Sequence, residues 1–328
     1  MFKFLLAAFI SVPLISFSQK TTATKKFRNE FSVVSDNDDY SFQFRDGYYT
    51  NGIYLKLSYA SDLSTSKWFN KPTIIKVVNG IEIGQAIYNP YSFSYSQPQQ
   101  QDRPFTGYLA LTFDKHIFYK SNNVLELGAS LGTIGPNSLG ENVQRWYHGV
   151  IGIYDVRGWP TQLNNEVSLN LKASFVKPLI TGDKEKRTFN IDAFAKAQLG
   201  NAFTNVSVGS LFRVGRIENN WNSSHWRARV SSSDGAAPVQ HHEIYFFYQP
   251  SITLQVYNAT LQGGMFINDK GPLTVDINPV VFTNQIGVRY AQSRWTTALI
   301  YIFRSKEAKR QIRSENLCSI QIAYRFKQ

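Results

Sequence analysis

His148 is the side chain in this sequence best suited to acid–base chemistry. An alternating pattern stops at residues 135–137, Gly-Pro-Asn, and the polar stretch that follows predicts a short helix with Asn137 or Ser138 as its N-cap. Gln144 lies four residues before His148, so a helix places both side chains on one face. Imidazole can act as a general base at neutral pH. A purely structural hydrogen bond is the alternative interpretation of a single histidine.

A second polar cluster, residues 36–39, reads Asp-Asn-Asp-Asp and is dense in the hard oxygen donors that suit Ca²⁺. It lacks the spacing of an EF-hand loop, so a solvated turn held by Asx hydrogen bonds is the alternative. Thr50 and Asn51 add a hydroxyl and an amide on the next predicted strand. Gly52 either permits a close approach to the backbone or eases a bend.

Two other kinds of site receive less support from the sequence. No Gly-x-Ser-x-Gly motif is present, which argues against a serine hydrolase of that type. The pair His241-His242 does not predict a metal site, because adjacent residues of a strand point to opposite faces.

The elements that must position these side chains are predicted to be strands, because apolar and polar residues alternate with period two. Residues 165–175, for example, place Val167 and Leu169 on one face and Ser168 and Asn170 on the other. The other predicted strands are residues 27–34, 49–59, 73–88, 107–118, 124–131, 188–199, 205–214, 242–248, 251–263, 280–290, 296–303 and 318–326. A single-chain bacterial barrel has an even number of strands, so we predict twelve, with one segment wrongly split or merged.

These patterns predict an all-β fold, a transmembrane antiparallel β-barrel of about 12 strands with a short helix in an extracellular loop. Aromatic residues form 15% of the chain, which suits the interface girdles of such a barrel. A secreted β-sandwich is the alternative fold. Residues 219–239, rich in Asn, Ser and Trp, are predicted to form a long loop.

The composition bounds where the protein works. Residues 1–18 have the features of a secretory signal peptide, and residues 19–328 are predicted to form one barrel domain. The formal net charge of +12 favours attraction to anionic lipid over nucleic acid, because the basic residues are scattered along an exported chain. The single cysteine, Cys318, excludes an intrachain disulfide. We expect a monomer.

The predicted topology gathers the polar clusters at one rim. If the first strand starts on the periplasmic side, odd-numbered strands end and even-numbered strands begin at the outer rim. The segments that meet there are residues 35–39, 46–52, 84–90, 101–107, 135–148 and 157–166. Residues 119–123 form a short connection at the other rim, as outer-membrane barrels usually show. The site is therefore predicted to face the outside of the bacterial outer membrane.

Together these residues resemble the LpxR family of outer-membrane lipid A 3′-O-deacylases. The resemblance covers about residues 35 to 166, and its ordered set of motifs is more specific than any one of them. The matching motifs are Asn37-Asp38-Asp39, Asp46 to Gly52, Gln85 to Pro90, Asp102 to Gly107, Glu126 to His148, Gly158 to Gln162 and Asn165-Glu166.

The resemblance implies Ca²⁺-dependent hydrolysis of the 3′-linked acyl or acyloxyacyl ester of lipid A, in the lipopolysaccharide of the outer leaflet. His148 would activate water, and a Ca²⁺ would stabilise the oxyanion. The residues that the match assigns to catalysis are His148, Asn37, Asp38, Thr50 and Gln144. It assigns Asp38, Asp39 and Glu166 to the metal, and Arg103 and Tyr154 to the substrate.

Two positions depart from the family pattern. Family members can carry a Lys-Arg pair after the third strand, whereas residues 91–101 here contain no basic residue. Lys67, Lys71, Arg103 and Arg157 are the candidates to replace that pair. A family tyrosine falls near Val156, two positions from Tyr154. An outer-membrane phospholipase and a non-enzymatic structural or pore barrel are the alternative functions.

Overall fold

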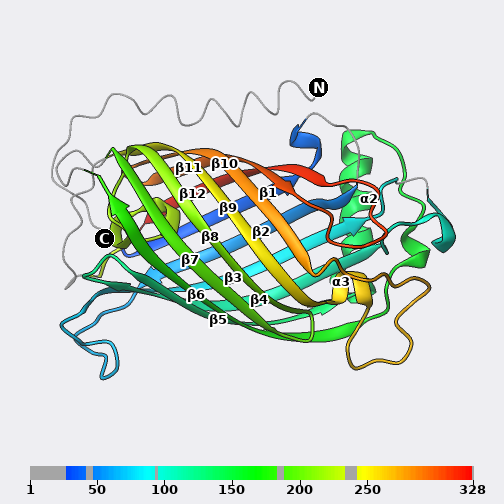
Figure 1. Cartoon of the computed structure of the whole chain (residues 1–328), viewed down its shortest axis with the longest axis horizontal. Coiled ribbons are helices and arrows are strands. Elements are labelled where there is room, and N and C mark those ends of the chain that lie inside the picture. Colours follow the sequence, from blue (N-terminus) through cyan, green and yellow to red (C-terminus); the bar gives the residue numbers. More distant parts are fainter. Residues whose placement is uncertain (1–26, 42–46, 93–94, 183–187, 233–241, 327–328) are drawn as a thin grey trace.

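Twelve strands form a closed antiparallel barrel in the computed structural model, which describes residues 27–41, 47–92, 95–182, 188–232 and 242–326. Each strand pairs with its neighbours in the chain, and the ring closes between β1 and β12 (Figure 1). The strands are β1 (Asn29–Asn37), β2 (Tyr48–Ala60), β3 (Ile74–Asn89), β4 (Thr106–Tyr119), β5 (Val124–Ile134), β6 (Glu166–Thr181), β7 (Phe189–Gly200), β8 (Phe203–Arg216), β9 (Glu243–Asn258), β10 (Val280–Gln292), β11 (Trp295–Arg304) and β12 (Glu315–Phe326). The predicted fold class and strand number are confirmed.

The two ends of the barrel differ. Odd-numbered strands end, and even-numbered strands begin, at the end that carries α2 (Gly140–Ile151) and α3 (Ala259–Gln262), here called the helix rim (Figure 1). The opposite end, the terminal rim, holds the start of β1, the end of β12 and the short connection at residues 120–123. The polar clusters of the N-terminal half therefore meet at one rim, as the sequence predicts.

The alternation along β6 shows how the chain faces its surroundings. Val167 and Leu169 are 68% and 61% exposed, whereas the residues between and after them, Ser168 and Asn170, are almost fully buried. Apolar side chains thus cover the outside and polar ones fill the inside, the reverse of a water-soluble protein. That arrangement is the one a membrane-spanning barrel requires.

The wrongly split strand is β9. The sequence predicts a break between residues 242–248 and 251–263, yet one strand, Glu243–Asn258, runs through Pro250. Pro250 pairs with Asn284 of β10, whereas the ladder with β8 has a gap there, between Gly209↔Ser251 and Phe212↔Tyr248, with no change of register. A proline lacks the N–H that a full ladder needs, so the strand tolerates it where one ladder is already broken.

The predicted loop after β8 does not hang outside the barrel. Its described part, residues 217–232, packs inside the barrel wall near the terminal rim, and we call it the lumen segment. Trp226, Ala228 and Val230 pack against wall residues from both halves of the chain, and Lys76 Nζ donates to Ala228 O at 2.6 Å. The lumen segment therefore fills the inside of the barrel from its terminal end.

Buried ion pairs hold the lumen segment and the barrel seam. Arg213 of β8 pairs with Asp192 at 3.0 Å and donates to Asn220 Oδ1 at 2.6 Å. At the seam, Arg325 of β12 pairs with Glu30 of β1 at 2.8 Å. Charges buried in this way are stable only when paired and hydrogen-bonded.

Some predictions fall on parts of the chain that the structure does not describe. The predicted signal peptide, residues 1–18, and residues 233–241, which include His241, lie outside the described residues. In the part of the chain that is described, no helix combines the length and the apolar character needed to cross a membrane.

Candidate active site

The helix that carries His148 begins and ends at residues with left-handed backbone. The chain leaves β5 through Gly135 (φ +81°), where a Cβ would lie 2.7 Å from the backbone of a neighbouring loop. A 3-10 turn, η4 (Pro136–Ser138), follows, and Leu139 (φ 60°) is the N-cap of α2. Gly152 (φ +72°) ends α2, and its amide donates to His148 O at 2.9 Å. Glycine reaches this conformation at little cost, so the helix stops directly after the turn that carries His148.

The predicted N-cap of α2, Asn137 or Ser138, is wrong. Ser138 Oγ donates to Gly135 O at 2.6 Å, and Asn137 N donates to Asn165 Oδ1 at 2.6 Å. Both residues close the turn that precedes the helix. The Ser138 hydroxyl, which local sequence rules predict to accept from a helix amide, therefore donates within the turn before the helix.

The prediction that Gln144 and His148 share a face of α2 is confirmed. Both are buried, whereas Trp146 and Val150 on the outer side are 67% and 64% exposed. Gly140 allows the helix to approach the barrel wall, because a Cβ there would lie 3.1 Å from the Cα of Gly107. The helix thus presents one polar, buried face to the rim.

The His148 ring is held in one orientation and one tautomer. Its Nδ1 lies 2.8 Å from Tyr154 O, and the Tyr154 ring packs edge-on against the imidazole at a centroid distance of 5.1 Å. A carbonyl oxygen can only accept, so Nδ1 carries the proton of this hydrogen bond. In the neutral ring the lone pair is then on Nε2, which is the form that a general base needs.

Trp159 anchors the same helix face. Its Nε1 donates to Gln144 Oε1 at 2.8 Å, and its ring packs on Phe105. Trp159 is fully buried, and Gly158 beside it has no room for a Cβ, which would lie 2.0 Å from the Phe105 ring. Gln144 therefore helps to hold α2 in place through its hydrogen bond with Trp159.

A charged pair supports α2 on its exposed side. Arg145 donates to Glu141 at 2.9 Å and also pairs with Asp155 in the following loop. The hydrogen bond to Glu141 raises the pKa of Arg145 above its usual value. The cation thereby links the helix to the loop that carries Tyr154.

The acidic cluster lies where β1 passes into β2. Asp38 Oδ2 accepts from Thr50 Oγ1 at 2.8 Å and from Gly47 N at 2.9 Å, while Asn37 Oδ1 accepts from Asp39 N at 2.7 Å. Asn37, Asp38 and Thr50 are all buried. The structure thus brings together three of the predicted residues, and hydrogen bonds fix their side chains.

A β-bulge aims Thr50 at Asp38. Tyr49 pairs with Tyr88 of β3 and Asn51 pairs with Ile87, so Thr50 is an extra residue in this ladder. Bulges of this kind redirect side chains and are frequent beside active sites. Without the extra residue, strict alternation would place Thr50 and Tyr49 on opposite faces.

The two halves of the site stand on neighbouring strands. β1 ends at Asn37, Asp38 follows it directly, and β2 carries Thr50. Beside them, β3 contacts the loop before α2 through Gln85, whose Nε2 donates to Ser138 O at 2.6 Å. The His148 helix and the acidic cluster are therefore connected through three adjacent strands of the helix rim.

Glu166, predicted as a metal ligand, lies in a different set of contacts. Its oxygens accept from Asn201 Nδ2 at 2.6 Å and from Phe266 N at 2.9 Å. Across the described ranges, no three His, Cys, Asp or Glu side chains gather in a way that could hold a metal. The structure uses Glu166 to join β6 to the loop after α3.

The predicted basic residues are distributed differently from the expectation. Arg103 is fully buried, lies 4.6 Å over the Tyr88 ring and donates to Thr260 Oγ1 at 3.1 Å. Lys67 and Lys71 lie between β2 and β3, at the terminal rim. Of the four candidates, only Arg157 lies exposed at the helix rim.

Three residues to which no local sequence pattern assigns a role hold the rim together: Tyr48, Asp102 and Trp159. Tyr48 OH donates to Asp102 Oδ2 at 2.7 Å, and the other Asp102 oxygen accepts from Tyr91 N. The available signal is that all three lie inside the motifs that carry the family resemblance. Their partners lie far away in the sequence, so no local pattern reveals these contacts.

Comparisons with known proteins agree with the fold. A family model described as outer membrane protein LpxR matches residues 4–326. Among solved structures, LpxR from Salmonella typhimurium is 20% identical, with a TM-score of 0.71 over 90% of this chain and 100% of that one. The translocator domain of the autotransporter NalP from Neisseria meningitidis is 8% identical, with a TM-score of 0.43 over 99% and 95% of the two chains. No curated protein sequence matches the chain.

Proposed function

Because this chain belongs to the LpxR family of outer membrane proteins, we propose that it is a lipid A 3′-O-deacylase. It hydrolyses the 3′-linked acyl or acyloxyacyl ester of lipopolysaccharide, with the helix rim facing the outside of the cell. The observation that carries the proposal is the orientation of His148, whose Nδ1–H donates to Tyr154 O and thereby places the lone pair of the neutral ring on Nε2.

His148 acts as the general base. The buried face of α2 holds the ring, and the Tyr154 carbonyl accepts a hydrogen bond from Nδ1–H, so Nε2 takes the proton of the attacking water. The positive charge that develops on the imidazole is stabilised by the same carbonyl. Tyr154 therefore positions the base through its backbone and packs against it with its ring.

The cluster of Asn37, Asp38, Asp39 and Thr50 supplies the electrophilic side. Its donors are carboxylate, amide and hydroxyl oxygens, the set that Ca²⁺ prefers, and two of its side chains are acidic. Asp38 and Asp39 would hold the ion, with Asn37 and Thr50 fixing their surroundings. A Ca²⁺ held there would polarise the ester carbonyl and stabilise its negative charge. Glu166 is left out of this proposed ligand set because both of its oxygens are engaged elsewhere.

Mass spectrometry of lipid A tests the proposal. Cells that produce the protein should yield lipid A lighter by one 3′-linked acyl or acyloxyacyl group, and chelation should prevent the change. Purified phospholipid serves as the second substrate. If phospholipid is cleaved and lipid A stays intact, the protein is a phospholipase instead. If neither substrate gives a product, the proposed enzymatic function is refuted.

A further inference from the structure

The loop between β11 and β12, residues 305–314, is the most basic exposed segment of the helix rim. It reads Ser-Lys-Glu-Ala-Lys-Arg-Gln-Ile-Arg-Ser, with four basic residues and one acidic residue. Lys306, Lys309, Arg310 and Arg313 are all exposed. We call residues 305–314 the basic loop. Neither the catalytic base nor the proposed metal site makes use of it.

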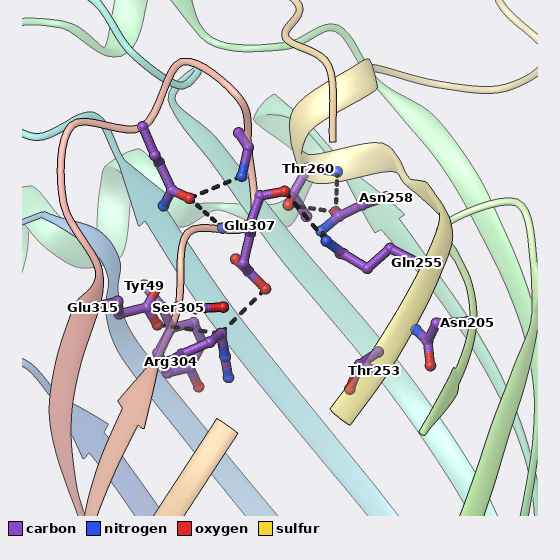
Figure 2. A network of polar contacts seen from close by, with 12 residues as sticks. Tyr49, Asn205, Thr253, Gln255, Asn258, Thr260, Arg304, Ser305, Glu307 and Glu315 are labelled. Carbon is purple, nitrogen blue, oxygen red and sulfur yellow. Dashed lines mark hydrogen bonds and ion pairs between the residues drawn. The ribbon is translucent and has the colours of Figure 1, made fainter. Parts of the chain in front are cut away.

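The acidic residue of the basic loop is turned inward. Glu307 pairs with Arg304 at 3.4 Å (Figure 2). It also pairs with the buried Arg103 at 3.6 Å. Its carboxylate therefore neutralises cations below the loop and not those on the surface. The fold separates the charges of this segment, leaving the positive ones outside.

The basic loop is held rigidly from below. Asn278 Nδ2 donates to Lys306 O and Ala308 O, and Gln255 Nε2 donates to Glu307 O at 3.2 Å. Gln311 Oε1 accepts from two amides of the same loop. A surface whose backbone is already ordered loses little entropy when it binds a ligand.

Both arginines are pre-positioned. The Arg313 guanidinium lies 5.2 Å from the centroid of the Tyr91 ring, and Arg310 NH2 donates to Gln99 O at 3.5 Å. Planar guanidinium groups bind phosphate oxygens through paired hydrogen bonds, which makes arginine well suited to this anion.

The basic loop is continuous with the acidic half of the site. Ile312 N and Arg313 N donate to Tyr48 OH at 3.0 Å, and the adjacent residue, Gly47, donates to Asp38. A molecule that binds Arg313 is thus bound beside the strand that carries Thr50.

We propose that Arg310 and Arg313 of the basic loop bind the phosphorylated headgroup of an anionic glycolipid in the outer leaflet, and so orient it for the neighbouring site. This inference rests on the proposed function for its substrate. It assigns phosphate recognition to the last hairpin of the barrel, in place of residues 91–101 after β3, which contain no basic residue.

Binding by the full-length protein in detergent micelles tests the assignment. The probes are fluorescent bis-phosphorylated lipid A and the same lipid after removal of both phosphates, each measured by anisotropy. R310Q/R313Q should weaken binding of the phosphorylated lipid about tenfold or more, because charged hydrogen bonds are lost, and should leave binding of the dephosphorylated lipid unchanged. Higher salt should reduce the difference in affinity for the phosphorylated lipid between the wild type and R310Q/R313Q, because it screens exposed charges.

The matched control is K67Q/K71Q, which removes two exposed cations from the terminal rim. It should bind both lipids as the wild type does. The assignment would be overturned if K67Q/K71Q lost as much affinity for the phosphorylated lipid as R310Q/R313Q, or if R310Q/R313Q kept the affinity of the wild type. Binding of inorganic phosphate alone as tightly as the lipid would also overturn it, because the site would then not require the headgroup.

Hydrolysis measured in parallel separates the two proposals. In one outcome, the wild-type protein binds the phosphorylated lipid but cleaves no ester, and R310Q/R313Q abolishes that binding. This result would refute the proposed deacylase activity and support phosphate binding by the basic loop. If R310Q/R313Q deacylates lipid A with the KM of the wild type, the result would support the proposed deacylase activity and refute phosphate binding by the basic loop.

Discussion

At the scale of single residues, the site depends on two hydrogen bonds to the backbone and one to a hydroxyl. His148 is bound to Tyr154 O, and Asp38 is bound to Gly47 N and to Thr50 Oγ1. Each hydrogen bond restricts the rotation of the His148 ring or of the Asp38 carboxylate. The site is therefore ordered by the fold itself.

Replacement of His148 tests the base. His148→Asn should lower the rate of deacylation by about a hundredfold or more, the usual contribution of general base catalysis. The barrel should keep its heat-modifiable mobility on gels. His242→Asn, at the terminal rim, is the control and should keep full activity. Retention of activity in His148→Asn would exclude this base.

Thr50→Val tests the side chain that the bulge aims at Asp38. It keeps the shape of threonine but removes the donor, leaving a buried carboxylate oxygen short of one partner at a cost of about 1–3 kcal/mol. We expect weaker activity at limiting Ca²⁺, and Thr50→Ser should restore it. Equal activity of both variants at every Ca²⁺ concentration would contradict this role for the hydroxyl.

Metal removal tests the carboxylates. Chelation should abolish deacylation, and Ca²⁺ should restore it, if oxygen ligands near Asp38 hold the ion. Asp38→Asn should raise the Ca²⁺ concentration needed for half-maximal activity about tenfold or more, since one ligand charge is lost. Asp269→Asn, an exposed residue of the same rim, should not shift that concentration. Full activity in chelator would refute the metal.

At the scale of elements, α2 is positioned by contacts on both sides. Gln144 is bound to Trp159 on the buried face, and Arg145 is bound to Glu141 and Asp155 on the exposed face. The helix is thereby joined to the loop that supplies the Tyr154 carbonyl. Moving either end would misplace the imidazole relative to the rim.

Trp159→Phe tests this anchor. A smaller phenyl ring replaces the indole, so Gln144 Oε1 loses a buried donor and a small cavity opens at this fully buried position. The lost hydrogen bond alone should make α2 less stable by about 1–3 kcal/mol, and the cavity adds to that loss. Amide exchange in residues 140–151 should accelerate and the rate of deacylation should fall. Trp146→Phe, at an exposed position of the same helix, should change neither. Unchanged exchange in Trp159→Phe would show that other contacts suffice.

The elements also show how far sequence reasoning extends. Strand alternation predicts the barrel because period two depends only on near neighbours. The N-cap of α2 and the unbroken β9 were predicted wrongly, because Ser138 is engaged by Gly135 and Pro250 lies at a gap in the ladder. The buried position of Arg103 depends on Thr260 and Glu307, far away in the chain.

At the scale of the whole molecule, the barrel is filled. The lumen segment contacts Lys76, Asp192 and Arg213 inside the wall, and the seam is closed by the buried pair of Arg325 and Glu30. The sequence predicts a loop at these residues but not its place in the lumen, because all of these partners are distant. Filling of this kind suits an enzyme scaffold better than a pore.

Conductance in planar bilayers tests the filling. The wild-type barrel should show no steady ion current, because the lumen segment and the wall side chains occupy its interior. Replacing residues 219–231 with a short Gly-Ser linker should produce measurable channels if the barrel still inserts. A large, steady current through the wild-type protein would support the pore alternative.

The exposed side of α2 has a consequence for kinetics. Trp146 and Val150 are exposed on a helix of the helix rim, and tryptophan prefers the boundary between lipid and water. A site beside such a helix receives its substrate by two-dimensional diffusion within the leaflet. Its rate should therefore depend on the mole fraction of substrate in the surface, and dilution with inert lipid should slow it even when the bulk concentration of substrate is constant.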